Sequence, residues 1–159
     1  PEGKIGEVAI RSQSNMKGYW RNDDATAECI NSEGWFKSGD LGKFDGPFLY
    51  ILDRLKDMVI RGGENIACPE VEGAIYEHPD VLEASVFGIP DERLGEILCS
   101  SICLREGSKL SIESLNEFLS DKLAAFKIPV KIKFTYNPLP KIASGKFDKP
   151  TMRQNFIEE

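Results

Sequence analysis

The sequence contains a single histidine, His78, and no apolar run of the roughly 18 residues that a membrane-spanning helix needs. Its four cysteines are scattered along the chain, at Cys29, Cys68, Cys99 and Cys103. The scarcity of histidine argues against a zinc site, and the cysteine spacing argues against the disulfide framework of a small secreted domain. We therefore expect no metal site, no membrane span, buried structural thiols and a reducing, cytoplasmic environment.

An initiator methionine and a signal-like segment are also missing from the start of the chain, Pro1-Glu2-Gly3-Lys4. These two absences favour a chain that is cut at its N-terminus. With 41% hydrophobic and 29% charged residues, the composition is nevertheless that of a folded globular protein. A length of 159 residues predicts one domain, or one domain with part of another.

Negative charge predominates, because 26 acidic side chains outnumber 20 basic ones and give a net charge of −6. This excess argues against a nucleic-acid-binding protein. The end of the chain differs, since residues 122–153 hold eight basic side chains and one acidic residue, Asp148. Two interpretations stay open for this basic segment: a solvated lysine face, or a local site for a polyanionic small molecule such as a nucleotide.

Residue patterns predict short β structure first and mixed structure afterwards. Up to residue 66 they indicate a strand over 6–11, a turn at 38–40, and hairpins over 41–52 and 57–66. Beyond it they predict a helix starting near Pro69, strands over 81–89 and 96–104, a helix capped by Ser111, a strand over 131–136 and a helix capped by Asp148. We expect an α+β fold, with a three-layer-like domain of a central sheet and flanking helices behind a short all-β piece.

Lys146 ends a loop of small residues, 140–146, just before the last predicted helix. Such a loop could deliver an ammonium group into a pocket that is built elsewhere. Because Phe147 follows the lysine, the segment does not match the Walker phosphate loop. A solvated cation in a turn is the simpler interpretation of this pattern taken alone.

Two further segments carry candidate binding residues. Asp40, in the predicted turn, could accept hydrogen bonds from the vicinal hydroxyls of a ribose, although aspartate is also an ordinary turn residue. Residues 53–57 carry four charges in five positions and therefore predict an exposed connector and a domain boundary. Within this connector, Arg54 could donate hydrogen bonds to a phosphate or a hydroxyl.

Four motifs stand in order along the chain: Ser-Gly-Asp-Leu at 38–41, Asp-Arg-Leu-Lys-Asp-Met-Val-Ile-Arg-Gly-Gly-Glu-Asn-Ile at 53–66, Pro-Glu-Val-Glu at 69–72 and Leu-Pro-Lys-Ile-Ala-Ser-Gly-Lys at 139–146. Together they resemble the adenylate-forming (AMP-binding) enzymes, which include acyl-CoA synthetases, nonribosomal-peptide adenylation domains and beetle luciferases. The resemblance covers only the C-terminal part of such an enzyme. It implies that residues 1–53 are the terminal β portion of a large N-terminal domain and that 54–159 are the mobile C-terminal domain.

An ATP-dependent acyl-CoA ligase activity, as part of a longer chain, is what the resemblance implies. ATP with Mg and a carboxylate give an acyl-adenylate and pyrophosphate, and coenzyme A then displaces AMP to form a thioester. ATP and Mg would bind mainly to the large domain, the principal partner of this chain. We therefore expect the chain alone to be inactive, and its parent to act on a fatty or aryl acid.

The same resemblance implies roles for individual residues. Lys146 corresponds to the adenylation lysine, Asp40 to the ligand of the ribose hydroxyls and Arg54 to a nucleotide contact. Lys56 falls at the hinge, where backbone angles change as the domains reorient. The coenzyme A tunnel would be lined by Arg61, Gly62, Gly63 and Glu64, whose glycines let a thin pantetheine arm pass close to the backbone.

Two other functions stay open. An adenylation domain that loads a carrier protein would normally be followed by the carrier itself, and the chain ends at residues 155–159 with no such sequence. A stand-alone nucleotide- or CoA-binding module would keep the fold without catalysis. Retention of Asp40, Arg54 and Lys146 together favours the enzyme over such a module.

Overall fold

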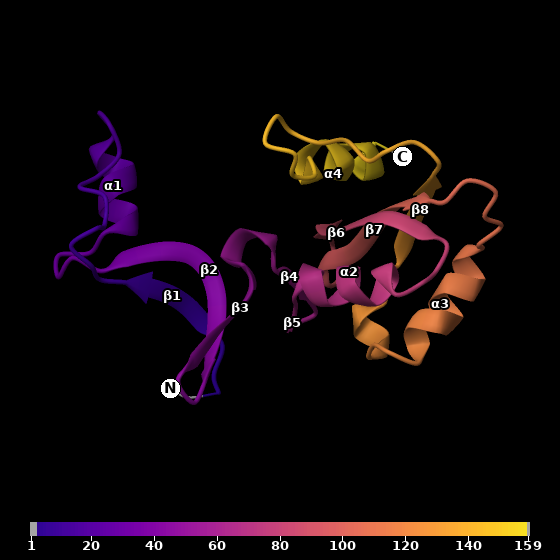
Figure 1. Cartoon of the computed structure of the whole chain (residues 1–159), viewed down its shortest axis with the longest axis horizontal. Helices are drawn as coiled ribbons and strands as arrows, with labels where there is room; N and C mark the ends of the chain where they lie inside the picture. Colours follow the sequence, from indigo (N-terminus) through magenta and orange to yellow (C-terminus); the bar gives the residue numbers. More distant parts are fainter. Residues whose placement is uncertain (1–2, 159) are drawn as a thin grey trace. The chain divides into compact units, whose positions relative to one another are not determined.

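Two compact units make up the chain in the computed structural model, which describes residues 3–158 (Figure 1). The first unit comprises Pro1–Lys56 and the second Asp57–Glu159. Lys56, the predicted hinge residue, is therefore the last residue of the first unit. The expectation that these units are the end of a large domain and a mobile domain stays a prediction.

The first unit is built on a three-stranded antiparallel sheet in the order β1-β2-β3. Its strands are β1 (Gly6–Ile10), β2 (Phe36–Asp45) and β3 (Phe48–Arg54). The hairpin between β2 and β3 is confirmed, and Gly46 and Pro47 form its two-residue connection.

The predicted turn at 38–40 is wrong, because this segment is a bulge within β2 and the chain does not reverse there. Across the β1–β2 pair, the three residues 38–40 lie opposite a single residue of β1, Val8. Gly39 has a φ of +73°, which glycine adopts without the steric cost that a Cβ would bring. Strand β2 stays extended on either side of this irregularity, where Lys37 pairs with Ala9 and Leu41 pairs with Glu7 of β1.

Helix α1 (Asp23–Cys29) lies in the segment that we expected to be entirely β. None of its seven residues is buried, so the helix leaves no apolar periodicity in the sequence. Its start is stabilised locally, since the side chain of Asn22 accepts a hydrogen bond from the backbone N–H of Ala25 at 3.1 Å. In the sequence, only this capping residue and the acidic residues Asp23 and Asp24 in the first turn indicate a helix at this place.

The second unit contains a five-stranded sheet around β7 (Gly95–Leu104). Strand β6 (Val81–Asp91) pairs antiparallel with one edge of β7 along its whole length. The other edge pairs with β4 (Val59–Arg61) at Gly95 and, in parallel, with β8 (Lys131–Thr135) farther along. Strand β5 (Glu64–Ile66) extends the sheet beyond β4.

Three α-helices complete the second unit: α2 (Cys68–Tyr76), α3 (Ile112–Ser120) and α4 (Lys149–Ile157). Two short 3₁₀ segments also occur among residues 3–158, η1 (Leu55–Asp57) and η2 (Ala125–Lys127). Both predicted caps are confirmed, because Ser111 accepts from the N–H of Ser114 at 3.1 Å and Asp148 accepts from that of Thr151 at 3.2 Å. No helix within residues 3–158 is long and apolar enough to cross a membrane.

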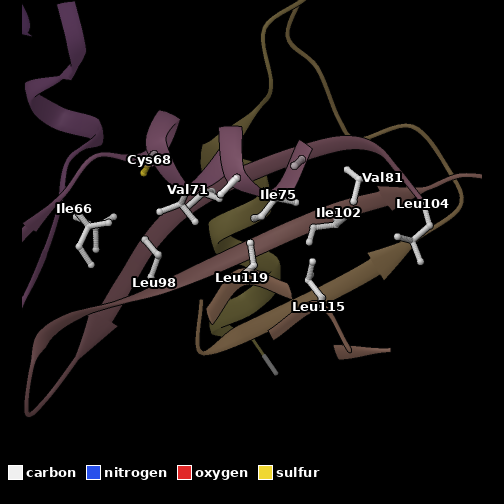
Figure 2. Packing of buried hydrophobic residues seen from close by; sticks show 14 residues of the cluster. Ile66, Cys68, Val71, Ile75, Val81, Leu98, Ile102, Leu104, Leu115 and Leu119 are labelled. Carbon is white, nitrogen blue, oxygen red and sulfur yellow. The ribbon is translucent and has the colours of Figure 1, made fainter. Parts of the chain in front are cut away.

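Alternating side chains of β6 and β7 point to opposite faces of the sheet. Each face is covered by helices, α2 and α3 on one side and α4 on the other (Figure 1). On the α2–α3 face the labelled core residues of Figure 2 are Ile66, Cys68, Val71, Ile75, Val81, Leu98, Ile102, Leu104, Leu115 and Leu119. On the α4 face the buried residues are Phe87, Ile89, Cys99, Cys103, Leu139, Met152 and Phe156. The α+β class with a layered second domain is confirmed.

None of the four cysteines forms a disulfide. Cys68, Cys99 and Cys103 are buried, as predicted, whereas Cys29 on α1 is only half-buried. Burial raises the pKa of the Cys99 thiol to about 11, because the thiolate would lose its hydration in the core. Cys99 is therefore a neutral packing group at physiological pH.

Replacement of Leu119 by alanine should lower the free energy of unfolding by about 2–5 kcal/mol, because this fully buried side chain leaves a cavity in a close-packed core. Leu82→Ala is the matched control, since Leu82 is 49% exposed and its truncation should change the value by less than about 1 kcal/mol. Urea denaturation followed by circular dichroism measures both. Equal losses would contradict the assignment of Leu119 to the core.

Candidate active site

Lys146 lies on a short hairpin between β8 and α4. The backbone N–H of Ile142 donates to the carbonyl oxygen of Lys146 at 2.9 Å, and the N–H of Gly145 donates to that of Ile142 at 2.9 Å. An isolated antiparallel bridge joins Lys141 to Phe147 and closes the stem. The segment expected to be a flexible loop is thus held by its own backbone hydrogen bonds, with Gly145 at a φ of +83°.

The side chain of Lys146 is exposed and makes no hydrogen bond or ion pair with any residue between 3 and 158. Its two lysine neighbours behave differently. Lys141 pairs with Glu83 at 2.5 Å, and Lys149 pairs with Glu72 at 3.0 Å. Of these three ammonium groups, Lys146 alone is therefore available to an added anion.

Glu83, on β6, binds the start of this hairpin with both oxygens of its carboxylate. One oxygen accepts from Lys141 Nζ at 2.5 Å and the other from the backbone N–H of Leu139 at 2.8 Å. The hydrogen bond from Lys141 lowers the pKa of Glu83, so its carboxyl group is ionised at neutral pH. Sequence analysis missed Glu83, because nothing local marks a carboxylate whose partners lie more than fifty residues away.

Glu72, on α2, holds the other end of the same segment. Its Oε1 accepts from the backbone N–H of Val86, on the free edge of β6, at 2.8 Å and from Lys149 Nζ at 3.0 Å. The side chains of Glu72 and Lys149 are each 19% exposed, so water screens this contact only in part. The contact joins α2 to α4 around the edge of β6, and the 69–72 motif was the only sequence signal for it.

Asp40 and Arg54 are brought together, as two candidate residues of the first unit. They are opposite each other in the β2–β3 pair, and Arg54 Nε lies 3.4 Å from Asp40 Oδ1. The side chains are 54% and 34% exposed, for Arg54 and Asp40 respectively, so the pair contributes little to stability. The carboxylate of Asp40 therefore remains accessible to a hydroxyl donor.

The predicted hairpin over Arg61–Glu64 is confirmed in its geometry. Its two central residues, Gly62 and Gly63, have φ angles of +59° and +88°, which defines a tight turn that glycine allows without strain. The side chain of Arg61 is engaged outside the hairpin, because its Nη1 donates to the carbonyl oxygen of Phe126 at 2.7 Å. This guanidinium group fixes the hairpin to the start of the segment before β8.

Two contacts from the β6–β7 loop and β7 hold this hairpin on the sheet. The N–H of Gly62 donates to the carbonyl oxygen of Leu94, and the N–H of Ile60 donates to Glu96 Oε2, both at 2.8 Å. Gly88 on β6 leaves the room that Glu96 needs, since a Cβ there would lie 2.9 Å from its Oε1.

Lys56 is exposed within η1, which agrees with the expected connector at this point of the chain. Within residues 3–158, no group of three or more His, Cys, Asp or Glu side chains could hold a metal ion.

Replacing Gly88 with alanine should lower the free energy of unfolding by about 1–3 kcal/mol, because the new methyl group would push Glu96 away from Ile60 and crowd Val59. Gly73→Ala is the matched control, because no atom lies within 4 Å of its added Cβ on α2. Alanine in that helix should hold the stability or raise it by up to about 1 kcal/mol. Thermal unfolding of the two variants decides the matter, and a Gly88→Ala protein as stable as the parent would refute the close packing.

Comparison with known proteins agrees with this geometry. Residues 70–146 match the model of the AMP-binding enzyme C-terminal domain. The chain is 41% identical to the feruloyl-CoA synthase of an Amycolatopsis species, over 98% of this chain and 32% of that protein. It is 40% identical to the mitochondrial medium-chain acyl-CoA ligase ACSF2 of Danio rerio, over 97% of this chain and 25% of the ligase.

A solved structure gives the same result for the fold. The ATP-bound MatB of Rhodopseudomonas palustris superposes with a TM-score of 0.90 at 34% identity, over 98% of this chain and 31% of MatB. The chain thus spans about a quarter to a third of the length of these three proteins. With its family motifs, its C-terminal-domain match and this fold, the chain belongs to the adenylate-forming, AMP-binding enzymes.

Proposed function

We propose that this chain is the C-terminal portion of an AMP-forming acid–thiol ligase that makes acyl-CoA thioesters. The observation that carries the proposal is the state of Lys146, whose ammonium group is unpaired and exposed on a hairpin that is itself held at both ends. A lysine in this state can reach an anionic substrate without first breaking an internal ion pair. The rest of the enzyme would supply the acyl pocket.

In the first half-reaction, an oxygen of the substrate carboxylate attacks the α-phosphorus of ATP, and the bond to pyrophosphate breaks. Two anions approach each other in this step, and charge builds on the phosphate oxygens. A compact ammonium group between them stabilises the transition state by several kcal/mol in a site from which water is excluded. We assign this role to Lys146.

Asp40 and Arg54 are the residues that we propose for nucleotide binding. The half-exposed carboxylate of Asp40 can accept hydrogen bonds from both hydroxyls of a ribose, while Arg54 fixes its orientation from the neighbouring strand. ATP would arrive with Mg, bound mainly by the large domain of the parent enzyme. Neither residue contributes much to stability, so a binding role explains the pair better than a structural one.

In the second half-reaction, the thiol of coenzyme A loses its proton to water, its sulfur attacks the acyl carbon, and AMP leaves with the electrons of the broken mixed-anhydride bond. We assign this step to the hairpin Arg61–Glu64. Its two central glycines leave the backbone open to a thin pantetheine chain, and Arg61 holds the hairpin in place. Lys56, at the end of the first unit, would be the hinge between the states that serve the two steps.

The acyl substrate of the parent enzyme is proposed to be a fatty or aryl carboxylic acid. This class rests on the names of relatives, which include a feruloyl-CoA synthase and a medium-chain acyl-CoA ligase. The same names, all CoA ligases, favour coenzyme A over a carrier protein as the thiol. They also favour a catalytic chain over a stand-alone binding module.

Lys146→Ala in the full-length parent enzyme should lower carboxylate-dependent ATP–pyrophosphate exchange by about 100- to 1,000-fold, since the transition state loses its cation. Thioester formation from preformed acyl-adenylate should stay within about threefold of the parent enzyme, because Lys146 serves only the first step. Lys122→Ala, which removes another partly exposed lysine of the same unit, is the control. Equal loss of both half-reactions in Lys146→Ala would exclude the role that we assign to it.

A further inference from the structure

We propose that Glu83 is a positioning residue of the adenylation half-reaction, because its carboxylate fixes the stem of the hairpin that carries Lys146. This inference rests on the proposed function of Lys146. Glu83 itself would touch neither ATP nor the carboxylate substrate. It would act by restricting the position of the hairpin, and thereby the positions that the Lys146 ammonium group can reach.

The geometry of Glu83 suits such a role because its two oxygens bind two different parts of the stem. The backbone contact to Leu139 fixes the main chain at the point where the segment leaves the core, and Leu139 is itself only 5% exposed. The side-chain contact to Lys141 fixes the first strand of the hairpin. A carboxylate that served only to neutralise a lysine would not need the backbone contact.

A second anchor at the far end makes the stem a closed unit. Asp148 N donates to the carbonyl oxygen of Pro140 at 2.9 Å, and Lys149 is bound by Glu72. The hairpin is therefore attached to β6 through Glu83 and to the edge of β6 and α2 through Glu72. Lys146 lies between these anchors and is the lysine that neither of them engages.

The ion pair of Glu83 should matter little for the stability of the domain and much more for the rate of the reaction. The side chains of Glu83 and Lys141 are 18% and 41% exposed, so their ion pair adds only modestly to the stability of the domain. A displacement of a catalytic group by about 1 Å can instead slow a reaction about 100-fold. Loss of Glu83 should thus change the rate of one half-reaction much more than it changes folding.

The test uses the full-length parent enzyme with Glu83→Ala and Glu83→Gln. In Glu83→Ala the kcat of ATP–pyrophosphate exchange should fall about 10- to 100-fold with little change in the KM for ATP. Thioester formation from preformed acyl-adenylate should stay within about twofold. Glu83→Gln should recover part of the loss, because its amide oxygen can still accept from Leu139 N–H while the ion pair with Lys141 is gone.

Glu77→Ala is the matched control, because it removes an ion pair of the same 2.5 Å length, to Lys122, that lies away from the hairpin. Neither half-reaction should change in this variant. If Glu83→Ala does not fold, as judged by its thermal transition, Lys141→Met carries the same test. That variant removes the ion pair with Glu83 and the contact of the ammonium group with the Phe147 ring, and it keeps the hydrogen bond between Glu83 and Leu139. It should lower exchange, but not thioester formation.

Combination with Lys146→Ala gives the decisive readout. If Glu83 acts through Lys146, then Glu83→Ala should cause no further loss of exchange in the Lys146→Ala background. Additive losses, equal losses in both half-reactions, or an unchanged exchange rate would overturn the positioning role. An exchange rate unaffected by Lys146→Ala alone would instead overturn the proposed function, so the two failures are distinguishable.

Discussion

Burial of both faces of the β6–β7 pair is the constraint on which the second unit depends. Apolar side chains alternate along these strands and point to both sides of the sheet, so a single helical layer could cover only half of them. Helices α2 and α3 follow the early strands and cover one face. The other face is left to α4, and the chain passes to it through the segment that follows β8.

Lys146 lies on the segment that makes this passage, so the packing constraint and the proposed chemistry share one stretch of chain. A connection to a covering helix is ordinarily exposed and variable. Here its backbone hydrogen bonds and the carboxylates of Glu83 and Glu72 hold it against β6. The other proposed segment, the hairpin Arg61–Glu64, is fixed separately through β7 and Arg61. One small domain thus presents two independently held elements.

Local signals predicted most elements of the fold, and the two failures have different physical causes. Ser111 and Asp148 predict the starts of their helices, because an N-cap side chain bonds to a backbone N–H only three residues away. Gly62 and Gly63 predict their turn, because few other residues adopt positive φ angles at two successive positions. Helix α1 was missed because it buries no side chain, and the bulge at 38–40 was taken for a turn because its strand partners are distant in sequence.

For the site, the sequence by itself determined which residues have the required chemistry: Lys146 after a small-residue loop, Asp40, Arg54 and the paired glycines. These features reside in residue type and short spacing. Only the tertiary structure decided how they are held. Arg61 proved to be engaged with Phe126, and Glu83, unmarked in the sequence, proved to bind both Leu139 and Lys141. The physical reason is that a hydrogen bond depends on distance in space, and folding alone brings residues more than fifty positions apart within 3 Å.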